Sequence, residues 1–208
     1  MIWDALLFDF DGVLADTEPV HYACWRQIVK PFGIQLDWTY YQKQCTGVSD
    51  RLMIDRLASG DPFKFEAIWS QYQAKQEMFR AELERTPPFL EESLALIREL
   101  HAGYRLAVVS SSARTEVEPP LARAGIRECF QSLVCGKEVQ NLKPAPDPYL
   151  KAAEILGARR PLVIEDSDAG VASGLAAGFE VLRVMDARTM AAEVRRKLGL
   201  AELDGGRL

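Results

Sequence analysis

Ala5-Leu6-Leu7-Phe8-Asp9-Phe10-Asp11-Gly12 is the stretch from which the rest of the chain can be interpreted. Residues 3–8 are mostly aromatic and aliphatic and contain no Gly or Pro, which predicts a buried strand. Side chains two residues apart point to the same side of a strand, so Asp9 and Asp11 leave its carboxyl end together. Gly12 supplies the permissive backbone that a sharp exit from the sheet needs. Because two neighbouring carboxylates repel each other unless a cation or a shared proton offsets their charge, Mg²⁺ is a natural partner for this turn.

Composition limits the classes of partner. The chain has 208 residues, which suits one large domain or a domain with an insertion, and a net charge of −5. Its basic residues form no patch that would follow a phosphate backbone, so we expect no nucleic-acid partner. We also expect no signal peptide and no membrane span, because the N-terminus lacks a basic region and no apolar run approaches about 18 residues.

The cysteines point to the expected compartment. The four cysteines have no Cys-x-x-Cys spacing and only two histidines accompany them, so the sequence does not suggest a zinc site. We expect a reduced, cytoplasmic setting and a monomer.

Apolar spacing divides the chain into a helical block and an α/β part. In the first block, helices are predicted over residues 19–30, 38–44, 51–57 and 63–84. Beyond Thr86-Pro87-Pro88, buried strands are predicted over residues 105–109, 131–135, 161–164 and 181–184. Helices are predicted around these strands over residues 91–101, 115–124, 148–156, 169–177 and 185–200.

This alternation predicts an α/β protein with a doubly wound, Rossmann-like parallel sheet. The predicted domains are an α/β core of residues 1–16 and 87–208 and an inserted all-helical domain of residues 17–86. An insertion at the carboxyl edge of a strand lies over the position where open α/β sheets bind ligands. We therefore expect the helical domain to act as a lid.

Polar side chains also follow three later strands: Ser110-Ser111-Ser112, Lys143 and Glu165-Asp166. The carboxyl ends of parallel strands share one edge, so these side chains are expected to gather with Asp9 and Asp11. Together they supply a nucleophile, a second carboxylate, a hydroxyl donor, a lysine and acids for a cation, as phosphoryl transfer requires. Singly, the serine is typical of a loop, the lysine of a solvated surface and the acidic pair of a helix cap. Because all of them occur together, in this order and each after an apolar strand, a functional site is favoured over these separate structural roles.

In this order the motifs resemble those of the haloacid dehalogenase superfamily, over nearly the whole chain. Asp9-Phe10-Asp11-Gly12-Val13-Leu14 matches the first motif, Ser110 the second, Lys143 the third and Glu165-Asp166 the fourth. The helical block looks like the family's helical cap, inserted after the first motif. Two segments look like the branch that holds β-phosphoglucomutase and related sugar-phosphate phosphatases, Lys143-Pro144-Ala145-Pro146-Asp147-Pro148 and Glu165-Asp166-Ser167-Asp168-Ala169-Gly170.

The resemblance implies a role for each motif residue. Asp9 would attack phosphorus and form an aspartyl-phosphate, and Asp11 would act as general acid and then as general base. Mg²⁺ would be held by Asp9, the Asp11 carbonyl and Asp166, with Glu165 as a direct or water-mediated partner. Ser110 and Lys143 would contact the phosphate. Further candidate substrate contacts are Gly12, Ser111, Ser112, Thr17, His21, Gly47, Arg51 and Lys75.

Two of these candidates carry alternatives. His21 lies one helical turn past Thr17, and the resemblance places it at the cap hinge near the general acid. The alternative is a partly exposed helical histidine. Lys75 stands where related mutases carry a cap lysine that reaches the substrate, and the alternative is a solvated lysine on a polar helix.

Two departures from the mutase pattern favour a phosphatase. In that pattern an arginine directly follows the loop resembling Gly47-Val48-Ser49, whereas here Asp50 precedes Arg51, and one residue turns a helical side chain by about 100°. The segment resembling Ser110-Ser111-Ser112 continues with lysine in mutases and with Ala113-Arg114 here. In both places a cation that would bind phosphate is missing or displaced, and a mutase must bind a second phosphate. We therefore expect Mg²⁺-dependent hydrolysis of a small phosphorylated metabolite, a sugar or polyol phosphate. A β-phosphoglucomutase-type mutase is the alternative.

Overall fold

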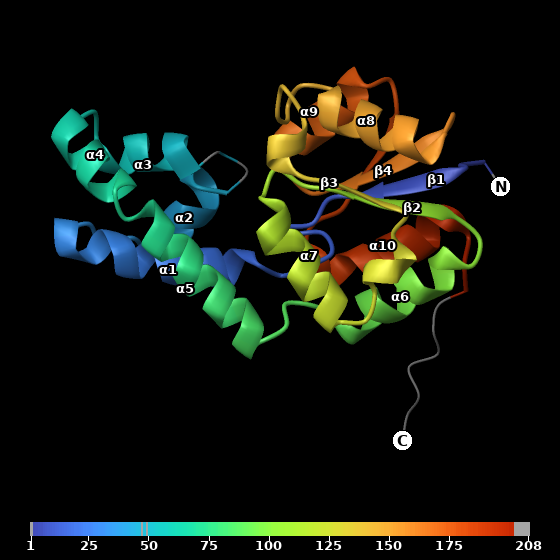
Figure 1. Ribbon diagram of the computed structural model, residues 1–208, viewed down its shortest axis with the longest axis horizontal. Coiled ribbons are helices and arrows are strands. Elements are labelled where there is room, and N and C mark those ends of the chain that lie inside the picture. Colours follow the sequence, from blue (N-terminus) through green and yellow to red (C-terminus); the bar gives the residue numbers. More distant parts are fainter. Residues whose placement is uncertain (1, 47, 49, 202–208) are drawn as a thin grey trace. The chain divides into compact units, whose positions relative to one another are not determined.

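The computed structural model describes residues 2–46, 48 and 50–201, and the chain divides into two compact units. One unit consists of Met1–Asp16 with Phe89–Leu208, and the other of Thr17–Pro88. The first unit is a sheet with helices on both faces, and the second is built from helices (Figure 1). The action of the second unit as a lid stays a prediction.

Among the described residues, five parallel strands form one sheet in the order β3-β2-β1-β4-β5. This arrangement confirms the predicted doubly wound α/β class. From β1 the chain adds β2 and β3 on one side and β4 and β5 on the other, so the order reverses between β1 and β4. Open α/β sheets bind ligands at such a switch point. The strands are β1 Ala5–Phe8, β2 Arg105–Val109, β3 Ser132–Val134, β4 Pro161–Glu165 and β5 Glu180–Arg183.

Helices cover both faces of the sheet, which explains why its central strands are apolar throughout (Figure 1). Leu6 and Phe8 of β1 pack on one face with α6, α7 and α10, while Ala5 and Leu7 pack on the other face with α8. The helices of this unit are α6 Glu91–His101, α7 Arg114–Arg123, α8 Asp147–Leu156, α9 Asp168–Ala176 and α10 Ala187–Leu198. Short 3-10 turns lie at η2 Arg127–Cys129 and η3 Gly136–Glu138.

The second unit has its own apolar core. Trp25, Val29, Ile54 and Ile68 are buried at its centre. Its elements are α1 Glu18–Val29, η1 Lys30–Phe32, α2 Trp38–Gln44, α3 Asp50–Ala58, α4 Pro62–Trp69 and α5 Tyr72–Arg85. Across the described part of both units, no helix has the length and apolar character needed to span a membrane.

One predicted helix is interrupted. The helical stretch expected over residues 63–84 breaks between α4 and α5, at Ser70 and Gln71. The Ser70 hydroxyl donates back to the Ala67 carbonyl at 2.7 Å, and the Gln71 N–H turns to Ile68, three residues back, at 3.0 Å. Such side-chain bonds to the backbone compete with helix continuation. The rings of Trp69 and Tyr72 stack across the break, with centroids 4.7 Å apart.

The four cysteines are buried and carry free thiols. Burial raises the pKa of Cys45 and of Cys135 to about 11. Both are therefore protonated at neutral pH, and they pack as small apolar side chains.

Replacing Ser93 by alanine is expected to stabilise the protein. The Ser93 hydroxyl is buried in α6 and has no hydrogen-bond partner within the described residues. A buried hydroxyl without a partner is unfavourable, and alanine is the better helix former, so the free energy of unfolding should rise by about 1 kcal/mol. Thermal unfolding should show a Tm higher by roughly 2–4 °C.

Ser173 provides the matched control. It is equally buried in α9, but its hydroxyl donates to the Ala145 carbonyl at 2.6 Å. Ser173→Ala should therefore lower the Tm, and a lower Tm for Ser93→Ala would contradict the prediction.

Candidate active site

A tight turn after β1 places two carboxylates at the switch point. The Asp9 N–H donates to the Ile164 carbonyl at 3.0 Å, which continues the pairing with β4, and the Ala15 N–H then closes the turn onto Phe10 at 2.9 Å. Gly12 has a φ of +79°, and a Cβ on it would lie 2.2 Å from an Asp166 carboxylate oxygen. Glycine is therefore needed here both for the backbone conformation and for the close approach of Asp166.

Lys143 joins the first and fourth motifs. Its ammonium donates to Asp9 Oδ1 at 2.5 Å, to Glu165 Oε1 at 2.6 Å and to the Val109 carbonyl at 2.9 Å. The lysine side chain is 6% exposed and the Glu165 side chain is fully buried. The surface-lysine alternative for Lys143 is therefore wrong.

The charges in this cluster are unbalanced. Burial raises the pKa of Asp9 well above its usual value, Lys143 opposes the shift, and the Glu165 and Asp166 carboxylates add to it. Burial alone would lower the pKa of Lys143, but the charges of Asp9 and Glu165 outweigh burial and raise it. Several carboxylates thus share one ammonium group, and an additional cation would stabilise their ionised forms.

The acidic residues fit a hard metal ion. Asp9, Glu165 and Asp166 each offer one carboxylate oxygen, and these oxygens lie within 4.8 Å of one another. A donor set made of oxygen alone suits Mg²⁺ better than softer metals. The cluster could therefore hold Mg²⁺.

Serine side chains hold the second carboxylate of the turn. Ser112 Oγ donates to Asp11 Oδ2 at 2.8 Å, and Ser110 Oγ lies 3.4 Å from the same oxygen. Ser110 is buried, its own N–H pairs with the Val134 carbonyl at 2.9 Å, and its hydroxyl accepts the Ser112 N–H at 3.0 Å. Ser111 is exposed at the tip of this loop. The loop after β2 thus orients Asp11.

Arg114, which follows this loop, is engaged elsewhere. Its Nε donates to Glu138 Oε1 at 2.6 Å and its Nη2 to the Leu133 carbonyl at 2.9 Å. Its Nη1 lies 3.5 Å from Glu118 Oε2. The guanidinium is therefore held by the protein itself and pairs with two carboxylates.

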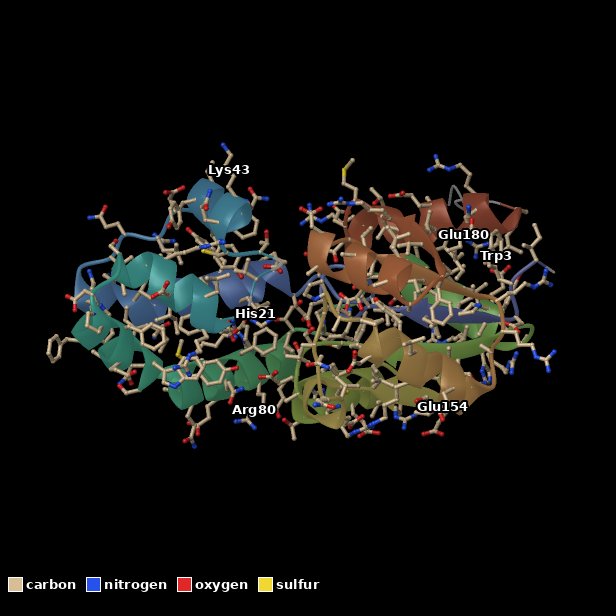
Figure 2. The ribbon with its side chains drawn as sticks, turned by 90° about the horizontal axis from the view of Figure 1, so that it is seen from above. Trp3, His21, Lys43, Arg80, Glu154 and Glu180 are labelled. Carbon is tan, nitrogen blue, oxygen red and sulfur yellow. The ribbon has the colours of Figure 1, made fainter. Side chains whose placement is uncertain are left out.

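His21 and Lys75 meet inside the helical unit. His21, labelled in Figure 2, projects from α1 and stacks on Phe79, with ring centroids 4.0 Å apart. Lys75 Nζ lies 2.9 Å from His21 Nδ1, and the lysine is 1% exposed. Since an ammonium only donates, Nδ1 is the acceptor in this contact. The solvated alternative for Lys75 is wrong.

The remaining candidates of the helical unit have different surroundings. Thr17 is fully buried at the start of α1, where its carbonyl accepts the His21 N–H at 2.9 Å. The Arg51 guanidinium lies 5.3 Å from the Phe65 ring and 5.2 Å from the Trp69 ring, and Arg51 lines an open hollow of about 570 Å³. Gly47 lies outside the described residues. Substrate contacts by these residues stay predictions.

Sequence reasoning missed two side chains of the site. The Tyr149 hydroxyl donates to Glu165 Oε1 at 2.8 Å, and Ser167 Oγ donates to Glu165 Oε2 at 3.1 Å. Ser167 also accepts the Gly170 N–H at 3.0 Å, so Ser167 caps α9, the role considered for Glu165-Asp166. The sequence did contain a signal for Tyr149: it begins a buried i, i+3, i+4, i+7 stripe on α8, where a hydroxyl needs a polar partner.

A doubly wound sheet with paired acids, a buried lysine and hydroxyls at its switch point defines a hydrolase of the haloacid dehalogenase type. The haloacid dehalogenase-like hydrolase family matches residues 6–184, and the chain belongs to it. This match confirms the resemblance drawn from the four motifs.

Individual relatives are similar along most of the chain. The fructose-1-phosphate phosphatase YqaB of Escherichia coli is 28% identical over 183 residues, covering 86% of this chain and 95% of the relative. A β-phosphoglucomutase of Mycobacterium tuberculosis is 32% identical over 209 aligned positions, covering 86% and 79%. The crystal structure of CbbY from Rhodobacter sphaeroides in complex with phosphate is similar with a TM-score of 0.71 at 28% identity, covering 100% of this chain and 92% of that one.

Proposed function

We propose that the protein is a Mg²⁺-dependent phosphatase that hydrolyses a small phosphorylated metabolite, a sugar or polyol phosphate, through an aspartyl-phosphate on Asp9. The observation that carries the proposal is the Lys143 ammonium, held between Asp9 at 2.5 Å and Glu165 at 2.6 Å beside the Asp166 carboxylate. Relatives named as phosphatases of phosphorylated carbohydrates support the substrate class.

In the first step, an Asp9 carboxylate oxygen forms a bond to phosphorus while the bond from phosphorus to the ester oxygen breaks. The leaving oxygen takes the proton of the Asp11 carboxyl group. Asp11 is two residues from the nucleophile, and the Ser112 hydroxyl fixes one of its oxygens at 2.8 Å. The nucleophile and the acid are thus separate groups at one strand end, as general acid catalysis requires.

In the second step, a water molecule attacks the phosphorus of the aspartyl-phosphate and gives a proton to Asp11. The bond between phosphorus and the Asp9 oxygen breaks, which releases inorganic phosphate and restores both aspartates. Lys143 places a positive charge beside Asp9, and Ser110 supplies a hydroxyl donor from the neighbouring strand end. Both would bind phosphate oxygens as negative charge shifts during transfer.

The residues that would hold Mg²⁺ are Asp9, Asp166 and the Asp11 carbonyl, with Glu165 as a direct or water-mediated partner. When bound, the ion offsets the repulsion between the Asp9 carboxylate and the phosphate. The raised pKa of Asp9 agrees with this requirement, because burial and neighbouring carboxylates disfavour its ionised form.

The surroundings of Arg114 favour the phosphatase over the mutase. A mutase must hold the second phosphate of a bisphosphate intermediate. Arg114 pairs with Glu138 at 2.6 Å and with Glu118 at 3.5 Å, and Ala113 carries no charge. Ala113 therefore cannot bind a second phosphate through a charge, and the Arg114 cation is already paired.

A substrate panel tests the proposed activity. The protein is incubated with sugar, polyol and nucleotide monophosphates in Mg²⁺, and inorganic phosphate is measured. We expect phosphate release from sugar or polyol phosphates and its loss in excess EDTA, with recovery when Mg²⁺ is restored. Release that is undiminished by EDTA would refute the metal dependence.

A second assay separates the phosphatase from the mutase. The protein is given β-glucose 1-phosphate with a trace of the 1,6-bisphosphate, and both products are quantified. The proposal predicts free phosphate, and accumulation of glucose 6-phosphate without it would establish the mutase instead.

A further inference from the structure

The Glu165 carboxylate is surrounded by donors from the protein. Lys143 Nζ and the Tyr149 hydroxyl donate to Oε1, at 2.6 and 2.8 Å. The Asp166 N–H, the Ser167 N–H and the Ser167 hydroxyl donate to Oε2, at 3.1, 3.2 and 3.1 Å. Glu165 is fully buried, so these five hydrogen bonds from the protein replace those that water would make to an exposed carboxylate.

This set of donors leaves Glu165 little capacity for a metal ion. An ionised carboxylate has about four lone-pair sites, and a direct metal ligand must keep one of them available. The backbone of α9 closes a further side, because a Cβ on Gly170 would lie 1.7 Å from Glu165 Oε1. Asp166 lies beside it with a carboxylate oxygen facing Gly12.

Tyr149 contacts both Glu165 and Lys143. It is fully buried in α8, its hydroxyl shares Oε1 with the Lys143 ammonium, and its ring lies 5.0 Å from Lys143 Nζ. The tyrosine therefore contacts both partners of the Lys143–Glu165 ion pair. Losing its hydroxyl would free one side of Oε1 and allow the carboxylate to rotate away from the lysine.

We propose that Tyr149 is a positioning residue that keeps Glu165 bonded to Lys143 and outside the direct coordination of Mg²⁺, so that Asp9 and Asp166 supply the side-chain ligands. The proposal rests on the proposed phosphatase function and decides between the direct and the indirect role of Glu165. In this arrangement Glu165 acts on catalysis by fixing the ammonium that binds the phosphate.

The first test is Tyr149→Phe, which removes the hydroxyl and keeps the ring over Lys143. At saturating Mg²⁺ we expect kcat to fall by about tenfold, while calorimetry gives a Kd for Mg²⁺ that is not weakened by more than about twofold. A Mg²⁺ affinity reduced tenfold or more would overturn the proposal, and so would an unchanged kcat. Tyr104 is a partly buried tyrosine that packs against the core of the same unit, and the control variant Tyr104→Phe should behave as the wild type.

A second pair of variants tests the ligand assignment even if Tyr149→Phe fails to fold. Calorimetry should show that Glu165→Gln weakens Mg²⁺ binding by no more than the roughly 10–100-fold that loss of an outer partner of a metal site typically costs, and that Asp166→Asn weakens it by at least about tenfold more. Equal losses in the two variants would show that Glu165 is a direct ligand. Since calorimetry needs no substrate, wild-type protein that binds Mg²⁺ but releases no phosphate would refute the proposed function alone. Wild-type protein that binds no Mg²⁺ would refute both.

Discussion

Asp9→Asn is expected to lower kcat for phosphate release by a factor of at least about 10⁴, without unfolding the protein. An amide oxygen is too weak a nucleophile to displace the ester oxygen, although asparagine keeps an acceptor for the Lys143 ammonium. Stability should change little, because burial already raises the pKa of Asp9 and makes its ionised form unfavourable in the metal-free protein. The measurements are kcat on the best substrate of the panel and chemical unfolding without Mg²⁺. Substantial residual turnover would show that another group attacks phosphorus.

Asp4→Asn is the control at the other end of the same strand. Asp4 accepts the N–H groups of Arg159 and Arg160 at 2.8 and 3.0 Å, and kcat should be unaffected when its charge is removed. Burial raises the pKa of Asp4, but these N–H groups and the Arg105 charge outweigh burial and lower it. Because the pKa of Asp4 is lower in the folded than in the unfolded protein, its ionised carboxylate stabilises the fold at pH values above the unfolded pKa of about 3.9. This stabilisation is lost as the pH falls through the folded pKa. The control should therefore lose about 1 kcal/mol at pH 7 and nothing at very low pH.

The fold was predictable because local rules and burial agree. Strands such as β2 Arg105–Val109 and β4 Pro161–Glu165 are buried on both faces, which requires unbroken apolar runs that are visible in the sequence. The polar residue that ends each run then falls at the carboxyl edge. Parallel topology alone brings Asp9, Ser110 and Glu165 to one edge, before any side-chain geometry is known. Lys143 lies in the loop between η3 and α8, and its ion pairs with Asp9 and Glu165 hold it at this edge.

The side-chain partners within the site could not be predicted in the same way. Periodicity places Tyr149 on the inner face of α8, but its acceptor, Glu165, is 16 residues away and is fixed only by the packing of α8 against the sheet. Lys75 lies on a polar helix and is nevertheless buried, because His21, Phe79 and Trp25 surround its ammonium. Contacts between distant segments decided both cases, and no local pattern encodes them.

Lys143→Met is expected to lower both stability and activity. Removing the ammonium leaves the buried Asp9 and Glu165 carboxylates without their counter-ion, which should reduce the free energy of unfolding of the metal-free protein by about 3–5 kcal/mol. Phosphate release should fall by about 10³-fold, because the charge that would bind the transferred phosphoryl group is gone. Denaturant unfolding and kcat at saturating Mg²⁺ measure the two effects. Lys43→Met, at an exposed position of α2, should change stability by less than about 1 kcal/mol.

The double variant Lys143→Met with Asp9→Asn shows whether the destabilisation has this electrostatic origin. Asparagine removes one of the two charges that the lysine compensated, so the double variant should be more stable than Lys143→Met alone. Residues that share a buried ion pair give interaction energies of about 0.5–3 kcal/mol in such a cycle. If the two stability changes simply add, Lys143 supports the fold through packing of its alkyl chain, and the charge argument is wrong. If they couple, the same ammonium that neutralises Asp9 in the resting protein is confirmed as the balancing charge of the site.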